Sequence, residues 1–295
     1  MEKPYFRQLS HSQNFLADEK FVAKLVGRAH LSKSDVVVEI GPGNGIVTGQ
    51  LAKVVGEVLA VEVDKALSEK LQKAIVPQLS NVKVINTDFL KWPLPKIPYK
   101  VFSNIPFNTT TDIIDRLLDN SNPPLETYLI MQKEAAKRFV GKPFAKINTL
   151  KSILLQPWYE MKVLELINKR EFRPTPGVNT MLVLFKKRAA PLVSEEHKQL
   201  FTDFIIYGFS KWCPTTLKAY DKIFTKNQSQ KLGKGLGIER SKPSELTLEN
   251  WLHVFNFFLT NTSNSKQALV AGSEDTLKKQ QAKLQKWHRT RKQTC

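Results

Sequence analysis

The chain has 295 residues, 41% of them hydrophobic, so it can bury one α/β core and still leave material for a smaller second domain. Its formal net charge of +18 favours a polyanionic partner, with nucleic acid as the first candidate and an anionic membrane as the alternative. There is no apolar run long enough to cross a bilayer and no signal-peptide core, which predicts a cytoplasmic protein. The cysteines, Cys213 and Cys295, are far apart and the histidines are scattered, so we expect neither a disulfide framework nor a bound metal.

A glycine-rich turn follows a β-branched run. Residues 35–40 (DVVVEI) have the pattern of a buried parallel strand, and Gly41–Gly45 (GPGNG) leads into a helical stretch expected at 46–54. Strand, glycine turn and helix form the first half of a nucleotide-binding βαβ unit, because glycines let the backbone approach a ligand and a helix start presents free N–H groups. The third glycine of the dinucleotide fingerprint is missing, which disfavours a dehydrogenase. The turn resembles the S-adenosylmethionine loop of Rossmann-type methyltransferases.

Carboxylates stand at the ends of the next two expected strands. The strand at 58–63 carries Glu62 about 20 residues past the glycine turn, where a carboxylate can accept hydrogen bonds from both ribose hydroxyls of an adenosyl group. Asp64 is expected to cap the helix at 65–75. The strand at 82–86 precedes Asp88, for which a hydrogen bond from the cofactor adenine and a simple turn or cap are equally open. The predicted cofactor-binding residues are Gln13, Asn14, Gly41, Pro42, Gly43, Glu62, Val63, Asp88, Phe89 and Asn104. For Gln13 and Asn14, which lie in the segment SQNFL, an ordinary helix-start cap is the alternative.

The fourth strand, expected at 101–103, ends in the segment NIPF. Pro106 restricts Ile105 to extended backbone geometry. The side-chain oxygen of Asn104 and the carbonyl of Ile105 could then bind the two hydrogens of an adenine amino group and turn its lone pair toward a methyl donor, a positioning role. Phe107 would stack on a base that has left its own stack. A proline-stiffened loop, FRPTP, is expected to hold an aromatic ring near the site, so the predicted catalytic residues are Asn104, Ile105, Pro106, Phe107 and Phe172.

Basic residues and a change of pattern organise the rest of the chain. Lys133 and Lys137 share a helical face, and Arg138 and Lys142 follow; phosphate contact and a solvated face are equally open for them. From about 197 to 259 the apolar spacing is helical, with a second glycine run, GKGLG, expected to form a loop between helices. We expect a Rossmann-like methyltransferase domain at 1–188, a helical RNA-binding domain at 189–260, and a basic, flexible tail at 261–295 whose contact with RNA is a hypothesis.

The motifs SQNFL, EIGPGNG, VEVD, TDFL, NIPF and FRPTP occur in this order, and from about residue 8 to 260 the chain resembles the ribosomal RNA adenine N6-methyltransferases. Within them it looks like the erythromycin-resistance (Erm) methyltransferases: NIPFNTTTDII lacks the proline that follows the threonines in the small-subunit dimethyltransferases, and FSKW and FTKNQ are similar to the resistance enzymes. The resemblance implies a Rossmann-like class I fold and S-adenosylmethionine-dependent N6-methylation of one adenine in the peptidyl-transferase loop of 23S rRNA. It also implies resistance to macrolides, lincosamides and streptogramin B.

Two alternatives remain. One is a small-subunit rRNA adenine dimethyltransferase, and the other is a non-catalytic nucleic-acid-binding protein that keeps the fold. The intact glycine turn, Glu62 and NIPF argue against the second, because a pure binder does not need all three. We expect a monomeric enzyme that uses S-adenosylmethionine on 23S rRNA, with no membrane or metal partner.

Overall fold

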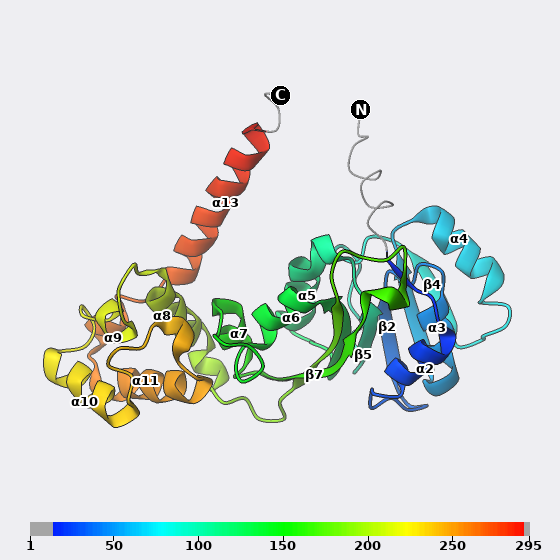
Figure 1. Ribbon diagram of the computed structural model, residues 1–295. Coiled ribbons are helices and arrows are strands. Elements are labelled where there is room, and N and C mark those ends of the chain that lie inside the picture. Colours follow the sequence, from blue (N-terminus) through cyan, green and yellow to red (C-terminus); the bar gives the residue numbers. More distant parts are fainter. Residues whose placement is uncertain (1–13, 292–295) are drawn as a thin grey trace. The chain divides into compact units, whose positions relative to one another are not determined.

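The structure, a computed structural model, describes residues 14–291, with side chains described as far as residue 283. The chain divides into two compact units (Figure 1). Within the described residues, the first unit takes the chain up to Lys137 together with Tyr159–Arg188, and the second takes Arg138–Trp158 and the chain from Ala189 onward. In this part of the chain no helix is both long and apolar enough to cross a lipid bilayer.

The first unit is built on a seven-stranded sheet with the strand order β4-β3-β2-β5-β6-β9-β7. The first five strands in this order are parallel, and β9 and β7 are antiparallel to their neighbours. The order reverses between β2 and β5, and ligands of open α/β sheets bind at the carboxyl ends of the strands beside such a switch point. The strands are β2 (Val36–Ile40), β3 (Glu57–Glu62), β4 (Val82–Asn86), β5 (Lys100–Asn104), β6 (Glu126–Gln132), β7 (Tyr159–Ile167) and β9 (Thr180–Lys187).

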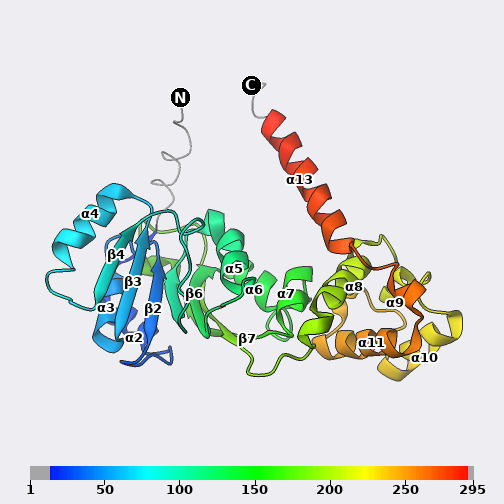
Figure 2. The ribbon, with the colours of Figure 1, turned by 180° about the vertical axis from the view of Figure 1, so that it is seen from behind.

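Helices flank this sheet (Figures 1 and 2). The apolar sides of two of them, α2 and α3, pack on one another and on the sheet, so that Val22 and Leu51 are fully buried in the same core as Val37 of β2. A separate two-stranded antiparallel sheet, β1 (Phe15–Leu16) and β8 (Phe172–Arg173), joins the start of the described chain to the loop before β9. The helices of this unit are α2 (Glu19–Val26), α3 (Ile46–Val54), α4 (Lys65–Ala74), α5 (Thr110–Leu118) and the first part of α6 (Lys133–Val140), with short 3-10 turns at Phe107–Thr109 and Lys169–Glu171.

The second unit is helical around an aromatic core. Phe204 stacks on Tyr220 at 4.5 Å between ring centroids, and Trp251 and Phe255 pack around the pair. The elements are α7 (Leu150–Leu155), α8 (Lys198–Ser210), α9 (Thr216–Ala219), α10 (Lys226–Leu236), α11 (Leu248–Asn261), α12 (Asn264–Gln267) and α13 (Ser273–Arg291), with 3-10 turns at Glu195–His197 and Pro243–Glu245.

The Rossmann-like fold class and the order of strands and helices around the glycine turn are confirmed. The expected cap of α4 is also present, since Asp64 accepts a hydrogen bond from the Leu67 N–H.

Three expectations need correction. Residues 138–158 belong with the helical unit, not with the first domain. The segment GKGLG lies mostly inside α10 and ends it at Gly237, whose φ is +67°. The tail beyond residue 261 continues as helices: Val270 is fully buried, and the buried Asp203 accepts hydrogen bonds from main-chain N–H groups at the start of α13.

Candidate active site

The glycine turn between β2 and α3 is shaped by left-handed backbone. Gly41, Gly43 and Gly45 have backbone φ values of +65°, +57° and +83°, which residues other than glycine rarely adopt. A methyl group at Gly43 would approach the ring of Phe15 to 2.2 Å, whereas one at Gly41 would meet nothing within 4 Å. Phe15 therefore covers the turn at Gly43. The backbone at Gly41 faces open space, as a backbone that lies against a ligand must.

Glu62 ties the end of β3 to this turn. Its Oε2 accepts a hydrogen bond from the Gly43 N–H at 3.1 Å, and its Oε1 accepts one from the Asp64 N–H at 2.9 Å. The side chain is fully buried, and this burial raises the pKa of Glu62. Each carboxylate oxygen keeps a second lone pair, so the group can still accept from hydroxyls of a ligand at the turn.

A second buried carboxyl group lies beside it. Glu39 of β2 accepts a hydrogen bond from the Thr48 hydroxyl at 2.6 Å, and burial raises the pKa of Glu39 to about 8. The protonated form of the Glu39 carboxyl group is therefore favoured by its burial. The sequence analysis did not assign Glu39 to the site, although its place two residues before Gly41 was visible.

The end of β4 supplies a turn. Asp88 Oδ1 accepts a hydrogen bond from the Leu90 N–H at 2.9 Å, which corresponds to the turn alternative left open for this residue. The half-buried carboxyl group retains acceptor capacity for a cofactor amine. Asn86 Nδ2 donates to the main-chain oxygen of Glu62 at 2.9 Å, so the ends of β3 and β4 are held together. Val63 is half-buried at this edge, whereas Pro42 and Phe89 are buried and support it by packing.

The NIPF turn begins at the last residue of β5. Asn104 Nδ2 donates a hydrogen bond to the main-chain oxygen of Asn14 at 2.9 Å, while its Oδ1 is buried and has no hydrogen-bond partner. An unpaired buried acceptor costs free energy, on the order of 1–3 kcal/mol, and such groups in native structures often mark functional sites. The donor bond fixes which way the amide faces. The free oxygen therefore keeps its capacity to accept a hydrogen bond from a ligand.

The rest of the turn is held by its main chain. Ile105 N–H donates to the Ile130 carbonyl at 3.2 Å, and its side chain is buried. Pro106 has φ −60° and ψ 133°, and its carbonyl accepts from the Thr109 N–H and the Thr110 hydroxyl. Phe107 is half-buried at the start of the following 3-10 turn.

A small cavity of about 30 Å³ lies between the turns and is lined by Asn14, Phe15, Gly41, Asn104, Ile105, Pro106 and Phe107. The structure thus brings Asn14 and Phe15 together with the glycine turn and NIPF. The cavity is too small for a purine ring. The half-buried rings of Phe15 and Phe107 form part of its lining. Gln13 lies outside the described residues.

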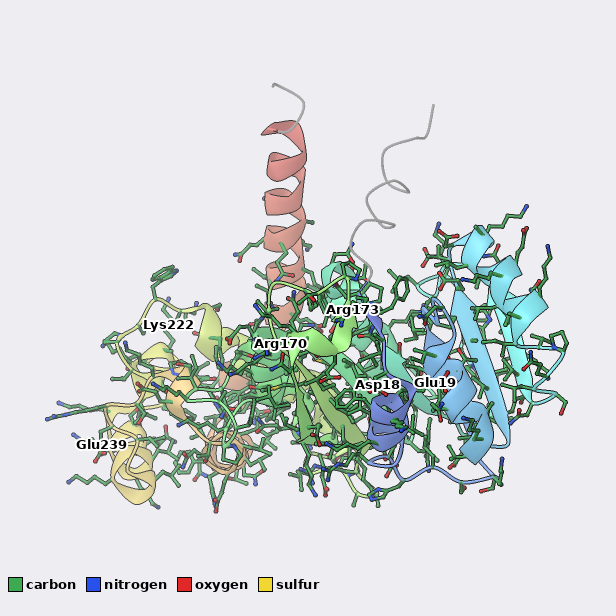
Figure 3. The ribbon with its side chains drawn as sticks, turned by 45° about the vertical axis from the view of Figure 1, so that its right-hand side comes forward. Asp18, Glu19, Arg170, Arg173, Lys222 and Glu239 are labelled. Atoms are coloured by element: carbon green, nitrogen blue, oxygen red, sulfur yellow. The ribbon has the colours of Figure 1, made fainter. Side chains whose placement is uncertain are left out.

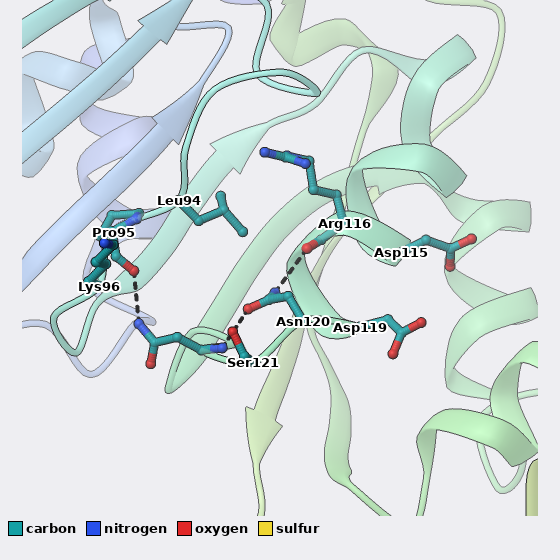
Figure 4. Close-up of a pocket in the computed structure, with 9 residues that line it drawn as sticks. Leu94, Pro95, Lys96, Asp115, Arg116, Asp119, Asn120 and Ser121 are labelled. Carbon is teal, nitrogen blue, oxygen red and sulfur yellow. Dashed lines mark hydrogen bonds between the residues drawn. The ribbon is translucent and has the colours of Figure 1, made fainter. Parts of the chain in front are cut away.

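A larger hollow of about 500 Å³ lies at the opposite edge of the sheet, between the loop before β5 and the end of α5 (Figure 4). Its polar groups serve the fold: Asn122 Nδ2 donates to the Pro95 carbonyl at 2.8 Å, and Asn120 Nδ2 donates to the last carbonyls of α5. None of the predicted site residues lines it.

Phe172 is fully buried, so the predicted contact between its ring and a target base is not available in this structure. The reason is the pairing of β8 with β1, which places Phe172 opposite Leu16 in the core. The ring instead anchors the segment that carries Asn14 and Phe15. Exposed arginines flank it: Arg170 and Arg173 lie near the start of α2, where Asp18 and Glu19 are labelled (Figure 3).

The predicted RNA-binding residues fall in both units. Lys133 and Lys137 belong to the first, where Lys137 Nζ pairs with Glu134 at 2.8 Å. Arg138 and Lys142 belong to the second, where Lys142 Nζ donates to the Glu245 carbonyl at 2.6 Å. Their contact with phosphate remains a prediction.

An open, mostly parallel sheet, a left-handed glycine turn after its first strand, a buried carboxylate at the end of the next and NIPF at the switch point define a Rossmann-like class I methyltransferase. The residues fit S-adenosylmethionine: Gly41 leaves open space beside the turn, Glu62 and Asp88 would offer acceptors to the adenosyl group, and Asn104 would serve the reacting end. When bound, this cofactor supplies an electrophilic methyl group. Among the described residues there is no cluster of metal-binding side chains.

Comparison with known proteins identifies the family. Residues 7–259 match the model of the family described as ribosomal RNA adenine dimethylase. An rRNA adenine N-6-methyltransferase from Bacillus licheniformis is 34% identical over 247 residues, covering 83% of this chain and 84% of that protein. The ribosomal RNA small subunit methyltransferase A of Lactococcus lactis is 32% identical over 241 residues, covering 79% of this chain and 82% of that protein.

Among solved structures, the 23S rRNA methyltransferase ErmE superimposes with a TM-score of 0.77 at 23% identity, over 84% of this chain and 100% of that one. A dimethyladenosine transferase from Plasmodium falciparum gives a TM-score of 0.66 at 19% identity, over 83% of this chain and 98% of that one. These likenesses show the fold. The chain belongs to the ribosomal RNA adenine dimethylase family and is an S-adenosylmethionine-dependent rRNA adenine N6-methyltransferase.

Proposed function

We propose that this enzyme methylates N6 of one adenine in the peptidyl-transferase loop of 23S rRNA and thereby gives resistance to macrolides, lincosamides and streptogramin B. The choice of target is supported by the residues after the catalytic turn, where NIPFNTTTDII has no proline following the threonines, and by FSKW and FTKNQ in the helical unit. Because the substrate is ribosomal RNA, we place the enzyme in the cytoplasm. We expect it to act as a monomer.

The observation that carries the chemistry is the unpaired Oδ1 of Asn104. An adenine amino group has two hydrogens and a lone pair that is conjugated with the ring. If one hydrogen bonds to this oxygen and the other to the Ile105 carbonyl, the nitrogen is held with its lone pair directed at the methyl group. The protein's contribution is then mainly orientation.

Phe107 gives the flipped base a surface. Base–aromatic stacking contributes about 1–3 kcal/mol, which offsets much of the cost of taking a base out of its stack. The half-buried ring lies in the wall of the small cavity, beside Asn104. The Phe107 ring has the same stacking face as a tyrosine ring and lacks only the hydroxyl group.

The test is to incubate the enzyme with labelled S-adenosylmethionine and purified large-subunit or small-subunit rRNA, and then to map the labelled nucleotide. Label at one adenine of 23S rRNA is the expected result. Label in small-subunit RNA alone would contradict the proposal.

A second candidate, a small-subunit rRNA adenine dimethyltransferase, is favoured by the similarity to the Lactococcus lactis protein, which matches nearly as well as the Bacillus licheniformis one. The same assay separates the two, because each predicts label in a different RNA.

A further inference from the structure

One large apolar side chain in the helical unit stands fully in solvent. Trp212 has a relative exposure of 105%, whereas the other exposed large hydrophobic side chains of the described chain lie between 36% and 54%. A tryptophan with its whole indole in water is unusual, because Trp is highly buried on average. Its position is not explained by packing or by any role in the cofactor site, which belongs to the other unit.

The loop that carries Trp212 is held from both sides. Before it, Lys211 Nζ lies 4.5 Å from the ring centroid of the buried Tyr207 at the end of α8. After it, Cys213 is partly buried against the aromatic core, and its N–H donates to the Lys211 carbonyl at 2.9 Å. Both neighbours of Trp212 thus contact the unit, while its own side chain is fully exposed.

Two further exposed cations lie on another loop of the same unit. The Thr216 N–H and hydroxyl both donate to the Ser241 carbonyl, at 2.8 and 2.9 Å, which places the loop of Arg240 and Lys242 beside the start of α9. Both of these side chains, like Lys211, are exposed. Lys242 N–H donates to the Glu245 carboxylate at 2.7 Å, and the Glu245 carbonyl accepts from Lys142 Nζ, so that loop 141–148 joins the same surface.

An exposed aromatic ring among cations is the arrangement that binds single-stranded nucleic acid, because bases stack on the ring while phosphates are attracted to the charges. We propose that Trp212 is a stacking platform for an unpaired base of the RNA substrate, with Lys211, Arg240 and Lys242 positioned for the flanking phosphates. This inference rests on the proposed function and adds a second base contact, on the helical unit, to the one at Phe107.

The experiment compares Trp212→Phe, which keeps a stacking ring, with Trp212→Leu, which keeps apolar volume without one. Binding is measured to a short single-stranded RNA and to the corresponding duplex, and methylation is measured with the 23S fragment that contains the peptidyl-transferase loop. We expect Trp212→Leu to bind the single strand and the 23S fragment about tenfold more weakly. We expect its KM to rise while kcat stays near the wild-type value, and Trp212→Phe to retain most of the affinity. Binding to the duplex should not change.

Leu269→Ala is the matched control, because it removes a large exposed side chain of the same unit that is 50% exposed. Arg240→Ala should lower the slope of log K against log salt by the amount expected for about one phosphate contact. Trp212→Leu should leave this slope unchanged. Thermal unfolding verifies that all variants fold, which is expected for side chains in solvent.

The inference would be overturned if Trp212→Leu and the wild type had equal RNA affinity and KM. It would also be overturned if the Phe and Leu variants lost RNA affinity equally. Binding to vesicles of anionic lipid that depends on Trp212, without an effect on RNA, would instead assign the ring to a membrane surface. These outcomes are distinct from a failure of the proposed function, which would appear as absence of label from 23S rRNA with the wild-type enzyme.

Discussion

The side-chain amide of Asn104 is oriented by the main chain of Asn14, because Asn104 Nδ2 donates to the Asn14 carbonyl at 2.9 Å across 90 positions of sequence. The opposite oxygen of the same amide is left buried and unpaired. The main chain of Asn14, just before β1, therefore determines which atom of the Asn104 amide stays free to accept a hydrogen bond.

Asn104→Asp should abolish most activity although it changes few atoms. The new carboxylate oxygen would face the Asn14 carbonyl oxygen, and two acceptors repel each other. The side chain would either rotate away or place a negative charge in the site. We expect kcat to fall by roughly 100- to 1000-fold, as when one preorganised hydrogen-bonding group is removed from a reacting centre. Single-turnover methylation of rRNA measures this.

Asn81→Asp is the matched control for that change, because Asn81 Nδ2 also donates to main-chain carbonyls, those of Ala52 and Val55. It should lower stability while leaving kcat of the folded enzyme unchanged. A comparable loss of kcat in both variants would show that Asn104 acts only through stability.

Phe107→Ala should lower kcat/KM by roughly 5- to 150-fold, the equivalent of one stacked base, with little effect on cofactor affinity. Phe107→Tyr should retain activity because the stacking face is kept. Calorimetric titration with S-adenosylmethionine supplies the second readout. An equal loss of cofactor affinity in Phe107→Ala would identify the ring as a packing element.

Gly43→Ala and Gly41→Ala test the contact of Phe15 with the glycine turn. Both place a side chain at positive φ, but only the methyl group at Gly43 meets the Phe15 ring, at 2.2 Å. We expect Gly43→Ala to lower the free energy of unfolding more than Gly41→Ala, and Phe15→Ala to recover part of the difference in the double variant. Additive effects of the two substitutions would contradict a direct contact.

Glu39→Gln should change how stability depends on pH. The folded-state pKa of Glu39 is raised to about 8 from an ordinary value of 4.5, so the native state holds this proton more tightly than the unfolded state. The resulting stabilisation is present at low pH and is lost as the pH rises through that interval, with a slope of at most about 1.4 kcal/mol per pH unit. Glutamine cannot ionise, so urea unfolding at about pH 6 and about pH 9 should show a smaller decline in the variant than in the wild type. Equal declines would mean that Glu39 is ionised in the folded protein.

Truncation after Gly272 should weaken RNA binding and flatten its salt dependence. The deleted segment, residues 273–295, contains seven Lys or Arg residues against two acidic ones. For every phosphate that the truncated protein no longer neutralises, the slope of log K against log salt should fall by about 0.7–0.9. The cut keeps the buried Val270 in place. An unchanged slope would show that α13 does not bind RNA.

Local sequence patterns predicted the helices and strands well, because these elements depend mainly on residues that are close in sequence. The glycine turn could be placed from DVVVEI and GPGNG, and the strand at Val82–Asn86 from its apolar run. Carboxyl ends of parallel strands share one edge, so Glu62 and Asn104 could be brought together without coordinates.

What could not be predicted depends on pairings between distant segments. The burial of Phe172 follows from its pairing with Leu16, and the capping of α13 follows from Asp203 on α8. The polar composition beyond residue 261 predicted a flexible tail, and it gave no indication that Val270 is buried. The exposure of Trp212 likewise gives no signal in sequence.

The most direct test of the central claim is nucleoside mass spectrometry of 23S and small-subunit rRNA after reaction with S-adenosylmethionine and either the wild type or Asn104→Asp. The account predicts N6-methylated adenine in 23S rRNA with the wild type, almost none with the variant, and no new methylated adenine in small-subunit rRNA. Equal methylation by both proteins, or methylation of small-subunit rRNA alone, would contradict it.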